Sequence, residues 1–180
     1  MKKLITFLSI LSVIFLVGCA GPQIKLLSIK ATSDKLTVEK AFNSISAILV
    51  DKGFDVKVAN KDIGLVTTEY KKFGAVEEFG PPFDYYLQIK AQVKSTPDGK
   101  VQIMMTPIVK EANRLNAAAF TEHELIFIPD DKQKGYLNAQ EKTELTGQLL
   151  FLNVVSATAE ALGIGMEQIE YSKQLGDKPL

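Results

Sequence analysis

Residues 85–106, YYLQIKAQVKSTPDGKVQIMMT, carry the clearest secondary-structure signal in the chain. From Tyr85 to Val93 the side chains alternate between apolar and polar, which is the period of a strand with one buried and one solvated face. Pro97-Asp98-Gly99 has the residue types of a tight turn. Val101 to Met105 alternates again on the return. The stretch therefore predicts an antiparallel hairpin in a sheet that is covered on one side only.

The neighbouring segments predict further strands of the same sheet. Ile24–Ala31 is a candidate first strand, and Phe54–Val58 and Leu65–Tyr70 read as a second hairpin. Phe120–Ile128 reads as a last strand. Because Pro107 has no N–H to donate, we expect the strand that contains it to end there or to lie at an edge.

Two amphipathic helices are expected to cover this sheet. Thr37 is a candidate N-cap, and Gly53 follows at a position that favours a left-handed glycine. Asn138 and Glu141 have the spacing of a capping box at the start of a longer helix, which Gly163 would end. The main apolar stripe predicted for the longer helix is Leu145, Leu149, Leu152, Val155 and Ala159, widened by Val154.

The order of elements is strand, helix, hairpin, hairpin, strand, helix. Strands that run together between two helices predict an α+β fold, an antiparallel β-sheet with two main helices packed on one face. We expect a single α+β domain over residues 24–165 and a polar, flexible tail over 166–180.

One segment resembles a known group of proteins. Asp51-Lys52-Gly53-Phe54-Asp55-Val56, followed by Asp62 to Tyr70, resembles the helix end and the "G-F-x-V" and "D-x-x-x-G-x-V/I-x-T" strands of BamC-type envelope lipoproteins. These proteins are accessory lipoproteins of the outer-membrane β-barrel assembly machinery. The resemblance implies a helix-grip-like domain, in which a helix lies across a curved antiparallel sheet.

The first residues have the layout of a secretory leader. Lys2 and Lys3 precede an apolar run from Leu4 to Val17, which is shorter than the roughly 20 residues of a transmembrane helix. The four-residue motif at the end of this run, Leu16-Val17-Gly18-Cys19, resembles the lipobox of bacterial lipoproteins. An uncleaved anchor helix is the alternative.

The resemblance to lipoproteins implies a cellular location. It implies removal of residues 1–18 as a signal peptide, a diacylglycerol and a fatty acid on Cys19, and a short tether over residues 19–23. Two or three acyl chains anchor a protein firmly, whereas one chain anchors it only marginally. Ala20 stands where an aspartate tends to signal retention in the inner membrane. We therefore expect a lipid-anchored protein of the cell envelope, at the outer membrane facing the periplasm if the organism is Gram-negative.

Composition argues against several partners and cofactors. Removal of the leader takes away Lys2 and Lys3, so 19 of the 21 cations remain against 21 anions and the formal charge is −2. A nucleic-acid-binding domain needs a clustered basic footprint, so no nucleic-acid partner is expected. One histidine and one lipidated cysteine do not make a zinc site of the usual ligand count. No metal and no cofactor beyond the lipid on Cys19 are expected.

No catalytic constellation stands out in the sequence. His123, beside Glu122 and Glu124, could be an acid–base residue, but we expect it to be a solvent-facing strand residue. Our first hypothesis is a non-enzymatic envelope lipoprotein that binds another envelope protein, with no prediction of its oligomeric state. The second is a carrier of a lipid or small apolar ligand in a cavity between helix and sheet, and the third is a cell-wall hydrolase.

The stretch from Lys71 to Phe83 reads as a loop with several aromatic residues. It is a candidate interaction loop or lid, and the alternative is a loop packed on its own core. Its apolar members are Phe73, Val76, Phe79 and Phe83.

Overall fold

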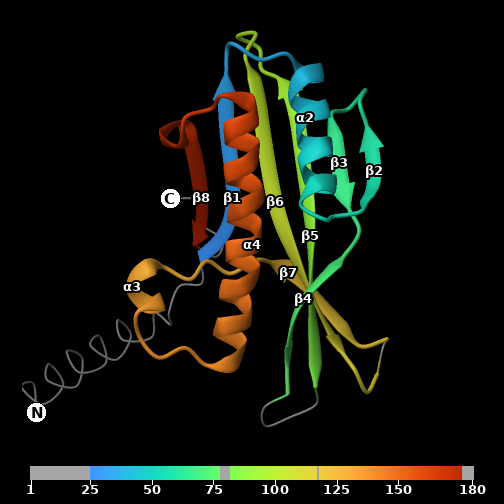
Figure 1. The fold of residues 1–180 in the computed structure, drawn as a ribbon, viewed down its shortest axis with the longest axis vertical. Coiled ribbons are helices and arrows are strands. Elements are labelled where there is room, and N and C mark those ends of the chain that lie inside the picture. Colours follow the sequence, from blue (N-terminus) through green and yellow to red (C-terminus); the bar gives the residue numbers. More distant parts are fainter. Residues whose placement is uncertain (1–24, 78–81, 117, 176–180) are drawn as a thin grey trace, which may run out of the picture.

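In the computed structural model, the hairpin predicted from residues 85–106 runs through the centre of the molecule (Figure 1). The structure describes residues 25–77, 82–116 and 118–175. β5 (Phe83–Ser95) and β6 (Val101–Asn113) pair antiparallel without a register shift over their whole length. Gly99 takes φ +80° in the connecting turn, a conformation that glycine adopts without strain. The hairpin is confirmed and extends beyond the alternating pattern at both outer ends.

The sheet built on this hairpin has eight strands within the described residues, in the order β2-β3-β5-β6-β1-β8, with β4 also paired to β5 and β7 to β6. Every pairing is antiparallel. The other strands are β1 (Lys25–Ser33), β2 (Val56–Asn60), β3 (Leu65–Thr68), β4 (Lys71–Val76), β7 (Phe120–Glu124) and β8 (Ile169–Leu175).

Two long helices, α2 (Val38–Asp51) and α4 (Ala139–Leu162), lie side by side on one face of the sheet (Figure 1). α3 (Asp130–Gln133) and the 3₁₀ turn η1 (Met166–Gln168) are short. The inward residues of β5, from Tyr85 to Val93, are buried against the helices. The predicted α+β fold, with two main helices on one face of an antiparallel sheet, is therefore confirmed.

α2 begins and ends where its local sequence predicts. The Thr37 Oγ1 accepts a hydrogen bond from the Lys40 N–H at 3.1 Å, and Gly53 takes φ +74° after the last turn. The side chains buried in the core are Ala41, Phe42, Ile45 and Leu49. Cap and apolar period agree here, so the helix and its buried face follow from sequence alone.

α4 has the predicted ends but a different buried face. The Asn138 side chain accepts from the Glu141 N–H at 2.8 Å, Glu141 accepts from the Asn138 N–H at 3.1 Å, and Gly163 takes φ +65°. The predicted stripe is wrong at Leu149, which is 57% exposed. Polar residues take part in the buried face instead, which consists of Thr143, Glu144, Gly147, Gln148, Phe151, Val154, Val155, Thr158, Ala159 and Leu162.

The buried polar residues of α4 complete the backbone hydrogen bonds of the segment that follows β7. Gln148 accepts from the Ile128 N–H at 2.7 Å and donates to the Ile128 carbonyl at 3.2 Å. Glu144 accepts from the Ile126 N–H at 3.4 Å. Buried backbone groups without a partner are costly, so these side chains stabilise a segment that is no longer in the sheet ladder.

The outer partners of the central hairpin change halfway along it, at the Ile89–Pro107 pair, a level that we call the seam. On the β5 side, β3 is the partner on one side of the seam and β4 on the other. Thr68 ends β3 there, and its Oγ1 accepts from the Ile89 N–H at 3.0 Å. Gln88 donates to the Thr68 carbonyl at 2.8 Å. A side-chain oxygen thus replaces the missing backbone acceptor.

Pro107 lies at the same seam on the β6 side, and the prediction that β6 ends or is an edge there is wrong. β1 pairs with β6 as far as Met105, and the pairing of β6 with β7 starts at Ile108, which lies opposite the last residue of β7, Glu124. The Pro107 carbonyl accepts from the Leu125 N–H at 3.2 Å, which shows that this peptide unit faces the gap between β1 and β7. A proline in this gap removes no ladder hydrogen bond, so the central strand continues through it.

Two segments predicted to lack regular structure form strands. Residues 71–76, predicted as part of a loop, are β4, which is paired to β5 with a register shift between Lys72 and Gly74. Within the predicted flexible tail over 166–180, residues 166–168 form η1 and 169–175 form β8, paired to β1. Residues 176–180 lie outside the described residues. Edge pairing with β1 orders a segment that looks too polar for a core strand.

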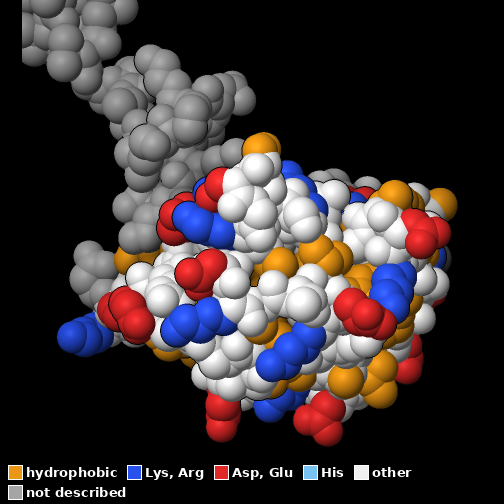
Figure 2. Space-filling model, turned by 90° about the horizontal axis from the view of Figure 1, so that it is seen from above, with side chains coloured by type: hydrophobic (Ala, Val, Ile, Leu, Met, Phe, Trp, Pro, Cys, Tyr) orange, Lys and Arg blue, Asp and Glu red, His pale blue; other side chains and the backbone are white. Residues whose placement is uncertain are grey.

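Charge is mixed over the surface seen end-on in Figure 2, where acidic and basic side chains are interspersed. In the described part of the chain, α4 is long and apolar enough to cross a membrane by length and composition. Core helices pass the same test, and its Phe151, Val154 and Val155 are buried inside this fold.

Candidate functional site

The residues predicted to carry function fall partly outside the described part of the chain. Leu16, Val17, Gly18 and Cys19 lie outside the described residues, as does Phe79. The other members of the candidate loop, Phe73, Val76 and Phe83, are partly buried and pack against the core from β4 and β5. Their placement agrees with the alternative of a segment packed on its own core.

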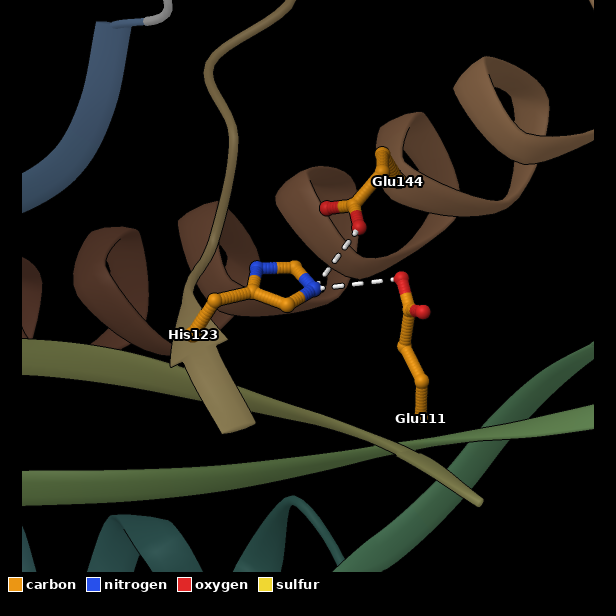
Figure 3. Close-up of side chains that lie close together, drawn as sticks. All are labelled: Glu111, His123 and Glu144. Carbon is orange, nitrogen blue, oxygen red and sulfur yellow. Dashed lines mark hydrogen bonds and ion pairs between the residues drawn. The ribbon is translucent and has the colours of Figure 1, made fainter. Parts of the chain in front are cut away.

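The structure instead brings together three ionisable side chains under α4 (Figure 3). Glu111 comes from the inward side of β6, His123 from β7 and Glu144 from the first half of α4. The His123 side chain is 29% exposed, Glu111 18% and Glu144 2%. The prediction that His123 faces solvent is wrong, because β7 pairs it with the buried Val109 and so turns it toward α4.

Both ring nitrogens of His123 have neighbours, but they differ in kind. The Nδ1 lies 2.9 Å from the Glu124 carbonyl, which can only accept, so this nitrogen carries a proton. The Nε2 lies 3.2 Å from Glu111 Oε1 and 3.7 Å from Glu144 Oε1. Only the first of these is a hydrogen bond. Glu144 Oε1 lacks a hydrogen-bond partner, and it is the only buried side-chain oxygen or nitrogen among the described residues that does.

The pKa values of the two carboxyls in the group are shifted in opposite directions. The hydrogen bond with Glu111 outweighs burial and raises the pKa of His123 to about 9, and the same bond lowers the pKa of Glu111. Burial raises the pKa of Glu144 to about 7 against the opposing effect of His123. Burial, with Glu111 and Glu144 nearby, raises the pKa of Tyr85 to about 12.

Divergent carboxyl pKa values are a feature of acid–base sites, but the geometry does not favour hydrolysis of a glycosidic bond. The imidazole of His123 lies between the two carboxylates and is hydrogen-bonded to Glu111. A glycosidic oxygen would have to displace it. Gln140 from α4 also donates to Glu111, at 3.4 Å, and closes that side. The group is therefore better suited to linking β6, β7 and α4 or to holding a cation.

The sequence alone does not reveal this group, because its members are distant in the chain. A signal for two of them was present. His123 stands two residues before the buried Leu125, which places both on one face of an extended segment. Glu144 stands four residues before Gln148 and seven before Phe151, which places the three on one face of a helix.

A second candidate site lies on the opposite face of the sheet, which neither long helix covers in the described part of the chain. We call it the outer patch, and it consists of Tyr70, Tyr86, Lys110, Arg114 and Phe120. The Lys110 ammonium lies over the Phe120 ring at 4.3 Å from its centroid and over the Tyr70 ring at 5.5 Å. The Tyr70 hydroxyl donates to Glu122 at 2.7 Å.

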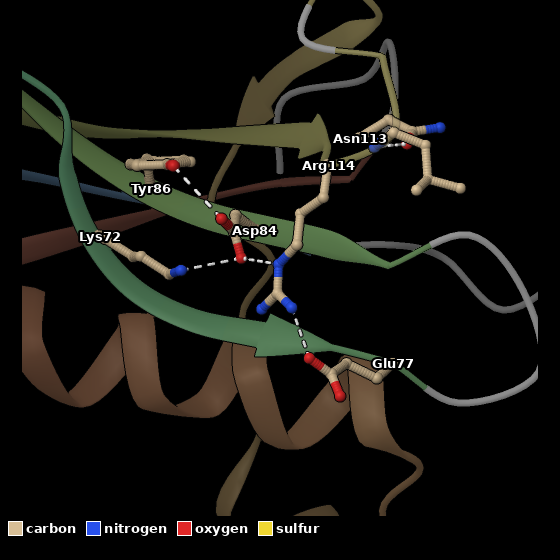
Figure 4. A network of polar contacts seen from close by, with 7 residues as sticks. Lys72, Glu77, Asp84, Tyr86, Asn113 and Arg114 are labelled. Carbon is tan, nitrogen blue, oxygen red and sulfur yellow. Dashed lines mark hydrogen bonds and ion pairs between the residues drawn. The ribbon is translucent and has the colours of Figure 1, made fainter.

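Asp84 lies at the other side of the outer patch and binds two of its members, Arg114 and Tyr86 (Figure 4). Its carboxylate accepts from Arg114 Nε at 2.6 Å, lies 2.9 Å from Lys72 Nζ, and accepts from the Tyr86 hydroxyl at 3.5 Å. Arg114 also pairs with Glu77. The hydrogen bond from Lys72 is the largest cause of the lowered pKa of Asp84. Rings and cations of the outer patch are thus held in one arrangement.

An open groove of ≈ 440 Å³ lies beside α4 at the β1 and β8 edge of the sheet. It is lined by Leu27, Phe127, Asp130, Gln148, Leu152 and Tyr171. The stretch predicted as a candidate lid, residues 73–83, contributes none of its described residues (73–77 and 82–83) to the lining of this groove.

No protein-family model matches the chain, and no curated protein matches its sequence.

Proposed function

We propose that this chain is a non-enzymatic envelope lipoprotein, held to a membrane by lipid on Cys19, that binds another envelope protein through the outer patch. The motif Leu16-Val17-Gly18-Cys19 supports the location in the cell envelope, at the outer membrane facing the periplasm if the organism is Gram-negative. The outer patch supports the binding role.

The observation that carries the binding role is an uncovered group of aromatic and cationic side chains that is already ordered. Tyrosine, phenylalanine and arginine are enriched in the centres of protein interfaces. Phe120 is 50% exposed, whereas Lys110, Glu122 and Asp84 hold the surrounding side chains in place. Side chains that are ordered before binding lose less conformational entropy on association, so such a patch binds at lower cost.

Site-specific photo-crosslinking in intact cells tests this role. A photoreactive residue at Phe120 should give one discrete crosslinked protein. The matched control is Leu149, a similarly exposed apolar residue of α4 on the other face of the sheet, and it should not give that product. Identical products from both positions, or only abundant bulk proteins from Phe120, would refute the outer patch as the binding surface.

The anchor is tested separately through Cys19→Ser. The parent should incorporate labelled palmitate and fractionate with membranes, and the variant should do neither. A variant that is processed, labelled and fractionated like the parent would contradict the lipid anchor without bearing on the outer patch.

The groove beside α4 favours a second candidate function, transport or storage of a small apolar ligand. Its volume of ≈ 440 Å³ lies within the usual range of roughly 300–1,000 Å³ for ligand pockets, and Leu27, Phe127, Leu152 and Tyr171 contribute apolar surface. Native mass spectrometry and organic extraction of the purified full chain should then reveal a co-purifying ligand. Recovery of ligand-free protein only would remove this candidate.

A further inference from the structure

We infer that Glu111, His123 and Glu144 form a binding site for a divalent transition-metal ion of the zinc type. Three donor atoms, one nitrogen and two carboxylate oxygens, lie within 4.8 Å of one another. The proposal is independent of the outer patch, which lies on the other face of the sheet. The sequence-based expectation of no metal counted histidine and cysteine only, and here carboxylates supply two of the three ligands.

The spacing of the donors fits such an ion. Zinc bonds to histidine nitrogen and carboxylate oxygen are about 2.0–2.1 Å long, so tetrahedral geometry places ligand atoms about 3.4 Å apart. The His123 Nε2 lies 3.2 Å from one carboxylate oxygen and 3.7 Å from the other. A small rotation of the Glu111 side chain, which is 18% exposed, would adjust the third distance.

The orientation of His123 is that of a metal ligand. Ligating histidines almost always donate their second ring N–H to a carboxylate, a backbone carbonyl or water, and this fixes the ring and its tautomer. The His123 Nδ1 makes such a bond to the Glu124 carbonyl at 2.9 Å. The Nε2 is therefore directed at the space that it shares with Glu111 and Glu144 (Figure 3).

The strongest indication of such a site is Glu144 Oε1, whose contact with His123 Nε2 at 3.7 Å is an ion pair but not a hydrogen bond. This oxygen is buried, is aimed at the group and accepts no hydrogen bond, while Oε2 of the same carboxylate accepts from the Ile126 N–H. One Nε2 proton cannot hydrogen-bond both carboxylates, and it lies closer to Glu111. A dication would take the place of the Nε2 proton of His123, which is released to solvent, would bind Glu144 Oε1 directly and would balance two carboxylate charges beside the neutral imidazole that remains.

The presence of a histidine ligand, His123, determines which cations the site would prefer. Calcium and magnesium prefer sets made only of oxygen ligands, whereas imidazole suits zinc and neighbouring transition metals. Three protein ligands leave one tetrahedral position open for water or a small molecule.

The test titrates the full chain with Zn²⁺. The protein is prepared without a histidine tag, held in detergent, stripped with EDTA and titrated in competition with a chromophoric chelator. The parent should bind one equivalent of Zn²⁺, and millimolar Ca²⁺ should not displace it. Glu144→Gln and His123→Gln should each weaken binding at least about tenfold, while Glu160→Gln, an exposed position of the same helix, should bind like the parent.

Folding is checked on each variant by circular dichroism before metal is added. If Glu144→Gln does not fold, Glu111→Gln replaces it as the test, since its side chain is more exposed. Co²⁺ supplies a second readout, because ligation by His123 should give visible absorption bands that His123→Gln lacks. Zinc uptake by the parent no greater than by His123→Gln, or unchanged in every folded glutamate variant, overturns the proposal.

Discussion

Gly64 closes the turn between β2 and β3 in a space that only glycine can occupy. Its φ is +63°, and a Cβ there would lie 1.8 Å from the Val93 carbonyl oxygen. The Gly64 carbonyl also accepts from the Val93 N–H at 2.8 Å, so the turn is attached to β5. Backbone would have to move to admit any side chain, and that hydrogen bond would be strained or lost.

We therefore expect Gly64→Ala to lower the free energy of unfolding by more than about 2 kcal/mol. Gly99→Ala is the matched control, because Gly99 has φ +80° but a Cβ added there would have no neighbour within 4 Å. Gly99→Ala should lower the free energy of unfolding by only about 1 kcal/mol, which is the cost of placing alanine in the left-handed conformation. Urea unfolding of both variants measures the difference, and equal losses would contradict the close approach to Val93.

Asp84 should make the free energy of unfolding depend on pH. Lys72 and Arg114 lower the pKa of its carboxyl in the folded state. A lowered folded pKa means stability that is present above the unfolded value of about 3.9 and is lost as the pH falls through the folded value. The loss should be about 1 kcal/mol, because both cations are partly exposed.

Asp84→Asn should therefore be less stable than the parent at pH 7 and should lose less stability between pH 5 and pH 2. Thermal unfolding across this range measures both effects. Asp55→Asn, an exposed aspartate outside the network, should follow the parent. Parallel curves for Asp84→Asn and the parent would show that the network does not stabilise the fold.

At the level of single elements, the seam shows how side chains and a proline accommodate a change of strand partners. Thr68 provides an acceptor for the Ile89 N–H, and Pro107 has no N–H at the corresponding place on β6. Leu125 then bridges the gap, because its N–H donates to Pro107 and its carbonyl accepts from the Leu27 N–H at 2.9 Å.

Thr68→Val removes only the hydroxyl of this arrangement and keeps shape and β-branching. It should cost about 1–3 kcal/mol, because the buried Ile89 N–H loses its acceptor. Thr67→Val, one residue earlier in β3, should be close to neutral, since the Thr67 N–H and carbonyl remain in the ladder. Chemical denaturation compares the two, and a neutral Thr68→Val would mean that another acceptor replaces the hydroxyl.

α4 shows why an apolar period can misplace a buried face. Glu144 and Gln148 are buried because they bind backbone groups of residues 126–128, whereas Leu149 is exposed. The hydrophobic pattern counts both polar residues as surface. Their burial depends on a segment that has left the sheet and needs partners, which the helix sequence does not contain.

Over the whole molecule, the two faces of the sheet differ in what covers them. One face packs on α2 and α4 and contains the group of Glu111, His123 and Glu144. The other face has no long helix over it in the described residues and contains the outer patch. If the outer patch binds a partner as proposed, a substitution at its exposed Phe120, which is outside the Asp84 network, should affect binding with little effect on stability.

Phe120→Ala is the sharpest test of this separation. It should lower the free energy of unfolding by less than about 1 kcal/mol, because the ring is 50% exposed. It should weaken binding of the partner that crosslinking identifies at least about tenfold, which corresponds to roughly 1.4 kcal/mol for the loss of an interface anchor. Leu149→Ala should change neither property. Unchanged partner binding with Phe120→Ala would place the interface elsewhere.

Local patterns in the sequence were enough for the central hairpin, the caps of α2 and α4, and the α+β class. These features depend on residues a few positions apart, so alternation, capping side chains and left-handed glycines predict them directly. The lipobox at Leu16–Cys19 is equally local and stays a prediction. β4, β8, the passage of β6 through Pro107 and the donors gathered around His123 emerged only from packing. Each needs a partner strand or helix far away in the chain, and no local period encodes which buried hydrogen-bonding groups will be left facing one another.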